Sequence, residues 1–313
     1  SEGVIFDNLF QLMAEKKASD IFITAGTPIH IKIQGHTMPI NQQVMDPLMI
    51  QRMLHEAITP AQQAVLERER ELNLSFGRRD LGNFRVNVFW QRNSMAVVVR
   101  YIQSDIPSIG ALGLPPVLDD IVLEKRGLVL VVGATGSGKS TTLAAMIDHR
   151  NESVSEHIIT IEDPIEFVHY NRLATIEQRE VGPDTRSFAA ALKFILRQDP
   201  DVILIGELRD IETISAALTA AETGHLVLAT LHTNDAPQTI DRVVDVFPPH
   251  QQSQIRVQLA ASLVAVVSQR LLLRADGQGR VGAFEVLVGT SAVRANVREG
   301  KTHQLQSVME TSA

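Results

Sequence analysis

The sequence contains no cysteine in its 313 residues. Neither a disulfide framework nor a cysteine-based zinc site can therefore form, and this composition is compatible with a reducing cytosol. The chain also has no basic excess: 29 Lys and Arg stand against 36 Asp and Glu, for a formal net charge of −7. This balance weighs against helicases and nucleic-acid translocases, although a local basic channel is not excluded. No apolar run approaches the roughly 18 residues of a membrane span, so none is expected.

A glycine-rich stretch matches the phosphate-loop pattern G-x-x-x-x-G-K-[ST] at every fixed position. It reads Gly133-Ala134-Thr135-Gly136-Ser137-Gly138-Lys139-Ser140, followed by Thr141. Apolar residues at 128–132 predict a buried strand before the loop, and 141–147 predict the start of a helix after it. Glycines let such a loop wrap closely round a phosphate with its N–H groups inward, and the helix N-terminus adds positive partial charge.

Two side chains of this loop have expected roles. Lys139 can reach the β- and γ-phosphates, and Ser140 can hold Mg²⁺ through its hydroxyl. The alternative is a glycine-rich turn before an ordinary helix, which rarely combines an apolar strand, several glycines and Lys-Ser. The sequence therefore predicts a protein that binds a nucleoside triphosphate.

Length and pattern predict two domains. Residues 1–103 predict a small α+β domain with a mainly antiparallel sheet. Its expected helices cover 4–17, 47–57 and a stretch from residue 60, and its expected strands cover 20–24, 29–35, 72–76, 84–90 and 95–102. The segment 104–116 is rich in Pro, Gly and Ser and predicts a linker, whose Ile and Leu residues suggest that it lies against protein.

Residues 117–313 alternate strands and helices, which is typical of an α/β domain with a mostly parallel sheet and helices on both faces. The expected strands cover 128–132, 157–161, 202–206 and 226–231, and the expected helices cover 185–198, 211–223, 250–268 and 291–299. Segments 269–273 and 280–288 predict a hairpin. In such a sheet the phosphate loop lies at the carboxyl end of its first strand.

Acidic residues follow two of the expected strands. One strand ends at Glu207, which can sit beside Mg²⁺, often through water; the alternative is a solvated strand end. Gly206 stands where many such ATPases have Asp, so that position offers no metal ligand. Glu162, Asp163 and Glu166 follow another strand. One of the three can orient and deprotonate an attacking water, and spacing alone neither chooses among them nor excludes an ordinary acidic turn.

Histidines and arginines supply further candidates. His225 and His232 bracket one strand, about 23 Å apart if it is extended, so they cannot share a metal ion. One of them is either a sensor for the γ-phosphate or a structural histidine. Arg85, Arg100 and Arg197 are either surface residues or arginines that complete a phosphate site from a domain or subunit edge.

Taken together, these residues resemble the secretion-type hexameric ATPases and, within them, the type IV pilus retraction motors of the PilT/PilU group. The resemblance runs from about Phe6 to Leu305. It is carried by the phosphate loop and by 18–20, 25–26, 82–86, 161–166, 196–201, 206–210, 222–225 and 230–234.

The resemblance implies a role for each site residue. The family's water-polarising glutamate falls on Glu166, and its atypical Walker B glutamate falls on Glu207. Its histidine pair falls on His225 and His232. The arginines that the first domain offers to the nucleotide fall on Arg85 and Arg100, and Arg197 matches another arginine of the family.

The resemblance also implies an architecture. The first domain is expected to be PAS-like and the second RecA-like, in a homohexameric ring. Each first domain packs on the next subunit's RecA-like domain, with ATP and Mg²⁺ between the domains. The expected location is cytoplasmic, docked at the inner membrane through a pilus platform protein, possibly with a paralogous retraction ATPase and without nucleic acid.

Two branches of the family differ in their extra parts. Pilus-extension and type II secretion ATPases carry an additional N-terminal domain and a four-cysteine zinc site. This chain is expected to start at the PAS-like domain and has no cysteine, which favours retraction. Residues 292–303 resemble the C-terminal motif of retraction motors but depart from it at Val293, Ala295 and Val297.

The expected function is ATP hydrolysis that drives pilus disassembly and twitching motility. The alternative is an accessory ring of the PilU type, with weak ATPase activity, that acts with a sister motor. Segments 22–26, 91–93 and 125–127 look closer to that paralogue. A small-molecule kinase is disfavoured, because it would need an acceptor pocket with a lid where this chain has a ring-type first domain.

Overall fold

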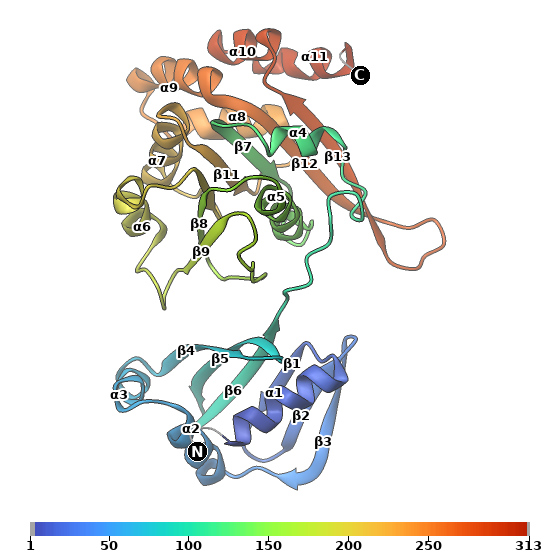
Figure 1. Ribbon diagram of the computed structural model, residues 1–313, viewed down its shortest axis with the longest axis vertical. Helices are drawn as coiled ribbons and strands as arrows, with labels where there is room; N and C mark the ends of the chain where they lie inside the picture. The colour runs from blue at the N-terminus through green and yellow to red at the C-terminus, as the bar shows by residue number, and fades with distance from the viewer. Residues whose placement is uncertain (1–3, 312–313) are drawn as a thin grey trace. The chain divides into compact units, whose positions relative to one another are not determined.

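A computed structural model describes residues 4–311 and falls into two compact units that divide between Ser104 and Asp105 (Figure 1). The division lies beside the predicted boundary at residue 103. Most of the segment expected as a linker, 104–116, belongs to the second unit, where Ile109 and Leu114 are buried.

The first unit is an antiparallel sheet with helices on one face. Its helices are α1 (Val4–Lys16), α2 (Pro47–Ala57) and α3 (Pro60–Glu69), and its strands are β1 (Asp20–Ile23), β2 (Pro28–Ile33), β3 (His36–Val44), β4 (Glu71–Arg78), β5 (Gly82–Gln91) and β6 (Ser94–Ile102). The strand order is β3-β2-β1-β6-β5-β4. Side-chain caps fix the starts of α2 and α3. The Asp46 carboxylate accepts from the Met49 N–H at the start of α2, and Thr59 forms a capping box with Gln62 at the start of α3.

Strand alternation divides the first unit into a buried and an open sheet face. Phe10 of α1 stacks on Phe84 of β5 at 4.3 Å between ring centroids, within the core. Arg85 follows Phe84 and points to the other face. There it lies directly across the strands from Arg100, which in turn lies opposite Asp20. The register thus gathers two of the predicted site arginines in one row.

The second unit is built on a mostly parallel sheet. Its strands are β7 (Gly127–Val132), β8 (His157–Glu162), β9 (Thr175–Glu180), β10 (Val202–Ile205), β11 (Leu226–Leu231), β12 (Leu263–Leu273) and β13 (Arg280–Val288). They are ordered β13-β12-β7-β11-β10-β8-β9, and β13 pairs with β12 as an antiparallel edge. Its helices are α4 (Val117–Ile121), α5 (Lys139–Ser153), α6 (Phe188–Ile195), α7 (Ile211–Glu222), α8 (Ala236–Asp245), α9 (Pro249–Ser262), α10 (Ser291–Arg298) and α11 (Leu305–Thr311), with 3₁₀ turns at η1 (Leu196–Gln198) and η2 (Thr302–Gln304).

Both faces of this sheet are covered, as the alternation of strands and helices predicts (Figure 1). One core joins α4 and α5 to strand residues such as Val129 and Val131. The other joins α6 to α10 to the alternate residues, such as Leu128 and Leu130. The parallel strands are therefore buried on both sides, and the loops at their carboxyl ends meet at one edge.

Several sequence-based assignments need correction. The helix expected over 250–268 ends at Ser262, and β12 starts at Leu263. Leu263 to Val267 is an apolar run whose pattern fits either structure, and here it lies in the sheet beside β7. The expected helix over 185–198 is α6 followed by η1, and the strands β3 and β9 and the helices α4, α8 and α11 have no counterpart in the prediction.

Candidate active site

The phosphate loop connects β7 to α5 in a tightly packed turn. Gly138 precedes the helix with φ +91°. A Cβ on Gly133 would lie 2.6 Å from the Gln269 carbonyl oxygen and 2.6 Å from Ser137 Oγ, so a side chain has no room there. Gln269 also donates from Nε2 to the Ser137 carbonyl at 2.6 Å. The loop is thus held in shape by its own glycines and by a side chain of β12.

A cavity of about 550 Å³ opens at the carboxyl ends of β7, β11, β10 and β8. Its position is the edge of the sheet where ligands bind in open α/β folds. Nine of the predicted site residues line it: Thr135, Gly136, Gly138, Lys139, Ser140, Thr141, Glu166, Glu207 and His232. Gly133, Ala134 and Ser137 line a second cavity on the other side of the loop. Residues from four separate stretches of the sequence therefore meet around one space.

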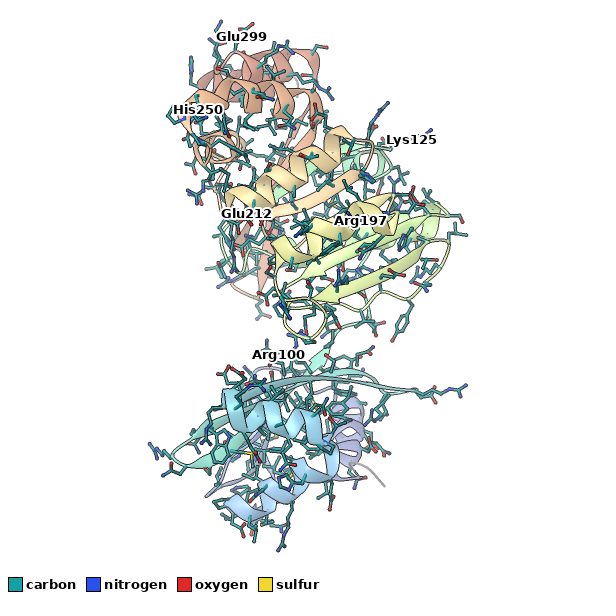
Figure 2. The ribbon with its side chains drawn as sticks, turned by 90° about the vertical axis from the view of Figure 1, so that its left-hand side faces the viewer. Arg100, Lys125, Arg197, Glu212, His250 and Glu299 are labelled. Atoms are coloured by element: carbon teal, nitrogen blue, oxygen red, sulfur yellow. The ribbon has the colours of Figure 1, made fainter. Side chains whose placement is uncertain are left out.

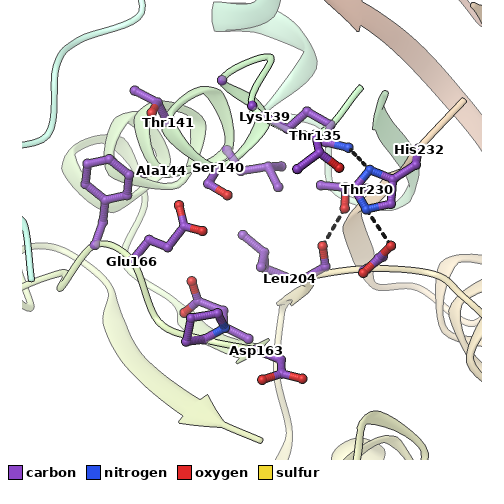
Figure 3. A pocket seen from close by; sticks show the side chains of 18 of the residues that line it. Thr135, Lys139, Ser140, Thr141, Ala144, Asp163, Glu166, Leu204, Thr230 and His232 are labelled. Carbon is purple, nitrogen blue, oxygen red and sulfur yellow. Dashed lines mark hydrogen bonds and ion pairs between the residues drawn. The ribbon is translucent and has the colours of Figure 1, made fainter. Parts of the chain in front are cut away.

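Lys139 starts a chain of polar contacts across this cavity (Figure 3). Its Nζ donates to the Gly133 carbonyl at 2.7 Å and lies 3.3 Å from the Leu231 carbonyl and 2.6 Å from His232 Nδ1. His232 Nε2 lies 2.7 Å from Glu207 Oε1. Since the Lys139 ammonium can only donate, the pair of contacts fits a neutral ring with its proton on Nε2. The other carboxylate oxygen of Glu207 pairs with Arg209.

Burial and charge act on Lys139 in opposite directions. Burial lowers the pKa of the Lys139 ammonium, and the nearby Glu207 carboxylate raises it. Only 8% of Lys139 is exposed, so its charge is shielded from water and is available to an anion entering the cavity. The site therefore combines a buried cation with the N–H groups at the start of α5, which suits a phosphate group.

The acidic segment after β8 lies on the opposite wall. Glu162, Asp163 and Glu166 all line the cavity. Glu162 is held by its neighbours, because its Oε2 accepts from the Thr160 hydroxyl at 2.7 Å and from Gln178 Nε2 at 3.1 Å. Glu166 instead extends its carboxylate into the cavity toward Ser140 (Figure 3). Glu162 is therefore turned to its neighbours, whereas Glu166 points toward the phosphate loop (Figure 3).

Gly206 has a packing reason to be glycine. A Cβ at this position would lie 3.3 Å from the Ile161 carbonyl oxygen and 3.4 Å from the Glu162 Cα. A side chain here would therefore fit only if the backbone of β8 or β10 shifted by a few tenths of an ångström. The carboxylate of this site stands one residue later, at Glu207, where 15% of the side chain is exposed.

The four remaining predicted site residues line neither of these two cavities. His225 precedes β11, at the far end of the strand from His232, and its Nδ1 lies 2.8 Å from the Pro200 carbonyl oxygen. Arg197 sits on the exposed turn η1, 5.7 Å from the Phe194 ring centroid (Figure 2). Arg85 and Arg100 belong to the first unit, where Arg100 Nε donates to Asp20 Oδ1 at 3.1 Å. Their roles at a nucleotide stay predictions.

The donor set suits Mg²⁺ only together with a ligand. Within residues 4–311 there is no group of three or more His, Cys, Asp or Glu side chains that could hold a metal ion. The Ser140 hydroxyl and the Glu207 carboxylate, both lining the cavity, are hard oxygen donors. Mg²⁺ is commonly held by one or two such protein oxygens plus the oxygens of a phosphate, and these two residues fit that arrangement.

Three supporting residues escaped the sequence-based prediction. Gln269 holds the phosphate loop, and Gln178 and Glu180 contact the acidic segment. All three lie on β12 or β9. Strand β9 has no counterpart in the sequence-based prediction, so Gln178 and Glu180 could not be placed. Gln269 begins the strand expected over 269–273, but nothing in the sequence relates it to the phosphate loop. In β9 only Ile176 is apolar, and residues 177–180 are all polar, so no hydrophobic alternation marks this strand in the sequence.

Comparison with known proteins identifies relatives over nearly the whole chain. Residues 2–311 match the family model of the Type II/IV secretion system protein. The type IV pilus ATPase PilU of Pseudomonas aeruginosa is 44% identical over 98% of this chain and 80% of its own length. The type IV pilus retraction ATPase PilT of the same organism is 45% identical over 97% of this chain and 88% of its own length.

Solved structures agree with these relatives. The crystal structure of the pilus retraction motor PilT with bound ADP superposes with a TM-score of 0.91 at 46% identity, covering 97% of this chain and 89% of the other. The Legionella pneumophila ATPase DotB gives 0.84 at 29% identity, covering 99% and 87%. The fold class predicted from the sequence is confirmed. None of the described helices combines the length and the hydrophobicity needed to cross a bilayer.

Proposed function

The chain belongs to the Type II/IV secretion system protein family, as its motifs indicated, and we propose that it is a hexameric ATPase motor that powers type IV pilus retraction. The observation that carries the proposal is the line of Lys139, His232 and Glu207 across one side of the cavity, with Glu166 facing it. A buried cation and a carboxylate facing it suit hydrolysis of a phosphoanhydride bound at a phosphate loop, and the histidine bonded to a second carboxylate adds polar groups on the same side.

ATP binding is expected to rearrange the contacts of Lys139. The N–H groups of the loop and of the first turn of α5 bind the phosphates, and Lys139 exchanges its carbonyl partners for the β- and γ-phosphate oxygens. His232 and Glu207 then face the γ-phosphate. Mg²⁺, held by the Ser140 hydroxyl and the Glu207 carboxylate together with phosphate oxygens, would neutralise negative charge on the phosphates.

Glu166 supplies the proton acceptor in this scheme. A water molecule between its carboxylate and the γ-phosphate gives a proton to Glu166 and attacks phosphorus, while the bond to the ADP oxygen breaks. The products are ADP and inorganic phosphate. Arg85 and Arg100 of a first unit, and Arg197, are proposed to stabilise the phosphate charge from the edges of the site, with His225 contributing to nucleotide binding.

Assembly and location follow from the family resemblance. The working form is a cytoplasmic homohexamer docked on an inner-membrane platform protein, and a paralogous ATPase can join it. An accessory PilU-type ring is the second candidate. Identity to PilU and to PilT is nearly equal, at 44% and 45%, so sequence similarity does not favour this alternative. Lys139, Glu166 and Glu207 all line the cavity, which supports a motor with its own ATPase activity.

The proposal is tested by replacing Glu207 and measuring ATP turnover and nucleotide binding separately. Glu207→Ala should keep binding of a fluorescent ATP analogue, because the loop and Lys139 remain, while turnover falls by about 100-fold or more. Glu212→Ala, an exposed glutamate on α7, is the matched control. Undiminished turnover in Glu207→Ala would remove this residue from the site. Tight binding with negligible turnover in the unsubstituted protein would instead support the accessory ring.

A further inference from the structure

Strand β9 lies beside the segment that carries Glu166. It pairs in parallel with β8, with Gln178 opposite Thr160 and Glu180 opposite Glu162. Neighbouring residues in register point to the same face of a sheet, so Gln178 and Glu180 share a face with Glu162. The segment 163–169 leaves β8 at its carboxyl end and passes these side chains.

Both side chains bond to the backbone of that segment rather than to its side chains. Glu180 Oε1 accepts from the Ile165 N–H at 3.0 Å. Gln178 Nε2 donates to the Phe167 carbonyl at 2.8 Å, and Gln178 Oε1 accepts from the His169 N–H at 2.8 Å. The residue immediately before Glu166 and the residue immediately after it are therefore both fixed by β9.

Glu180 is a buried carboxyl group that depends on its hydrogen bonds. Glu180 is only 4% exposed, and a buried carboxyl group destabilises a protein unless its hydrogen bonds are made. The Asp184 carboxylate accepts from the Glu180 N–H at 2.9 Å and holds the end of the strand. Gln178 also donates to Glu162 Oε2 at 3.1 Å, which keeps that carboxylate on the β9 side of the site.

We propose that Gln178 and Glu180 are positioning residues that set how far Glu166 reaches into the cavity. They hold the backbone of the residues before and after Glu166, through the Ile165 N–H and the Phe167 carbonyl, so the Glu166 carboxylate stays at the distance from the phosphate loop where an attacking water fits. A displacement of about 1 Å at a reacting group can lower a rate by about 100-fold. The inference rests on the proposed function, since it assigns to Glu166 the role of proton acceptor.

The test replaces each side chain with one of similar size that cannot hydrogen-bond, and compares turnover with nucleotide affinity. Gln178→Met and Glu180→Met should each lower kcat for ATP hydrolysis by about tenfold or more, with the Kd for ATP changed by less than about twofold. Glu180→Gln keeps an oxygen that accepts from Ile165 and should retain most of the activity. Glu177→Met, on the exposed side of the same strand, is the matched control and should turn over normally.

A double-substitution cycle separates positioning from general stability. Glu166→Gln alone should lower kcat strongly, and adding Gln178→Met should then cause little further loss, because the group being positioned is already gone. Equal fold-losses in both backgrounds, normal kcat in both Met variants, or a Glu180→Gln variant as impaired as Glu180→Met would overturn the inference. Normal turnover in Glu166→Gln would overturn the proposed role of Glu166 itself, and the inference with it.

Discussion

At the scale of single residues, the site depends on where charge is buried. Lys139 keeps a cation at the phosphate loop by bonding to main-chain carbonyls and to Nδ1 of His232, whose Nε2 contacts Glu207. Burial and a nearby charge also act on His169, which lines the cavity and lies near Arg172.

His169 predicts a loss of stability in acid. Burial, and to a lesser extent the positive charge of Arg172, lowers the pKa of His169 from 6.5 to about 4. Between pH 6.5 and pH 4 the unfolded chain therefore binds a proton that the folded chain does not. The unfolding free energy falls as the pH is lowered through this window. The loss of unfolding free energy due to His169 reaches about 2–3 kcal/mol near pH 4.

Denaturant unfolding of the unsubstituted protein and of His169→Gln measures this pH-dependent loss of unfolding free energy. The glutamine variant should lose less unfolding free energy between pH 7 and pH 4.5, by about 2 kcal/mol. Comparing the two proteins cancels the other groups that titrate in the same range. Parallel pH profiles would show that His169 is not held neutral in the folded state.

At the scale of elements, helix α5 links the site to the body of the second unit. It begins at the phosphate loop, and near its other end Arg150, which is 3% exposed, donates to the carbonyls of Val122 and Glu124 at 2.7 and 2.6 Å. Arg150 also forms a buried ion pair with Glu156. These bonds fix the helix against the segment after α4.

Arg150→Met should lower the unfolding free energy by about 3–5 kcal/mol, because it leaves the Glu156 carboxylate buried and unpaired. Arg172→Met is the control: this arginine is half-exposed, pairs with Glu152 of the same helix, and should cost less than about 1 kcal/mol. Chemical denaturation of both variants gives the comparison. Equal small losses would mean that the Arg150 cluster does not hold α5.

Elements also show what the sequence can predict. The sequence predicts helices from residues 47 and 60, where α2 and α3 do start, because proline is favoured at the first position of a helix. The phosphate loop is likewise recognised from its own local motif. Strand β3 has almost no buried residue and β9 alternates weakly, so neither carries a hydrophobic period. Because β9 is not predicted, Gln178 and Glu180 could not be recognised from the sequence as neighbours of Glu166.

At the scale of the whole molecule, the two arginines of the first unit raise the question of which subunit's nucleotide site they complete. Arg85 and Arg100 face each other across β5 and β6 on the open face of their sheet. In a ring, such a pair can reach a nucleotide bound by a neighbouring subunit, which no single chain can reveal. The residues themselves leave open whether these arginines are surface residues or complete a phosphate site, and the family resemblance assigns them to the nucleotide.

Mixing two inactive variants tests this arrangement. Arg85→Ala should depress hydrolysis while nucleotide binding by the loop is kept, and Lys139→Ala should abolish turnover. If a site takes Lys139 from one subunit and Arg85 from another, mixed rings contain some intact sites and recover turnover. Unchanged hydrolysis in Arg85→Ala, or no recovery on mixing subunits that exchange, would mean that the arginine does not act across subunits.

A ring ATPase completes its active sites only on assembly, so its ATP turnover per subunit should depend on protein concentration. Specific activity should rise with concentration to a plateau as rings assemble, and Lys139→Ala should show none at any concentration. Turnover per subunit that stays constant down to concentrations at which the protein sediments as a monomer would contradict the claim, since each chain would then hydrolyse ATP alone.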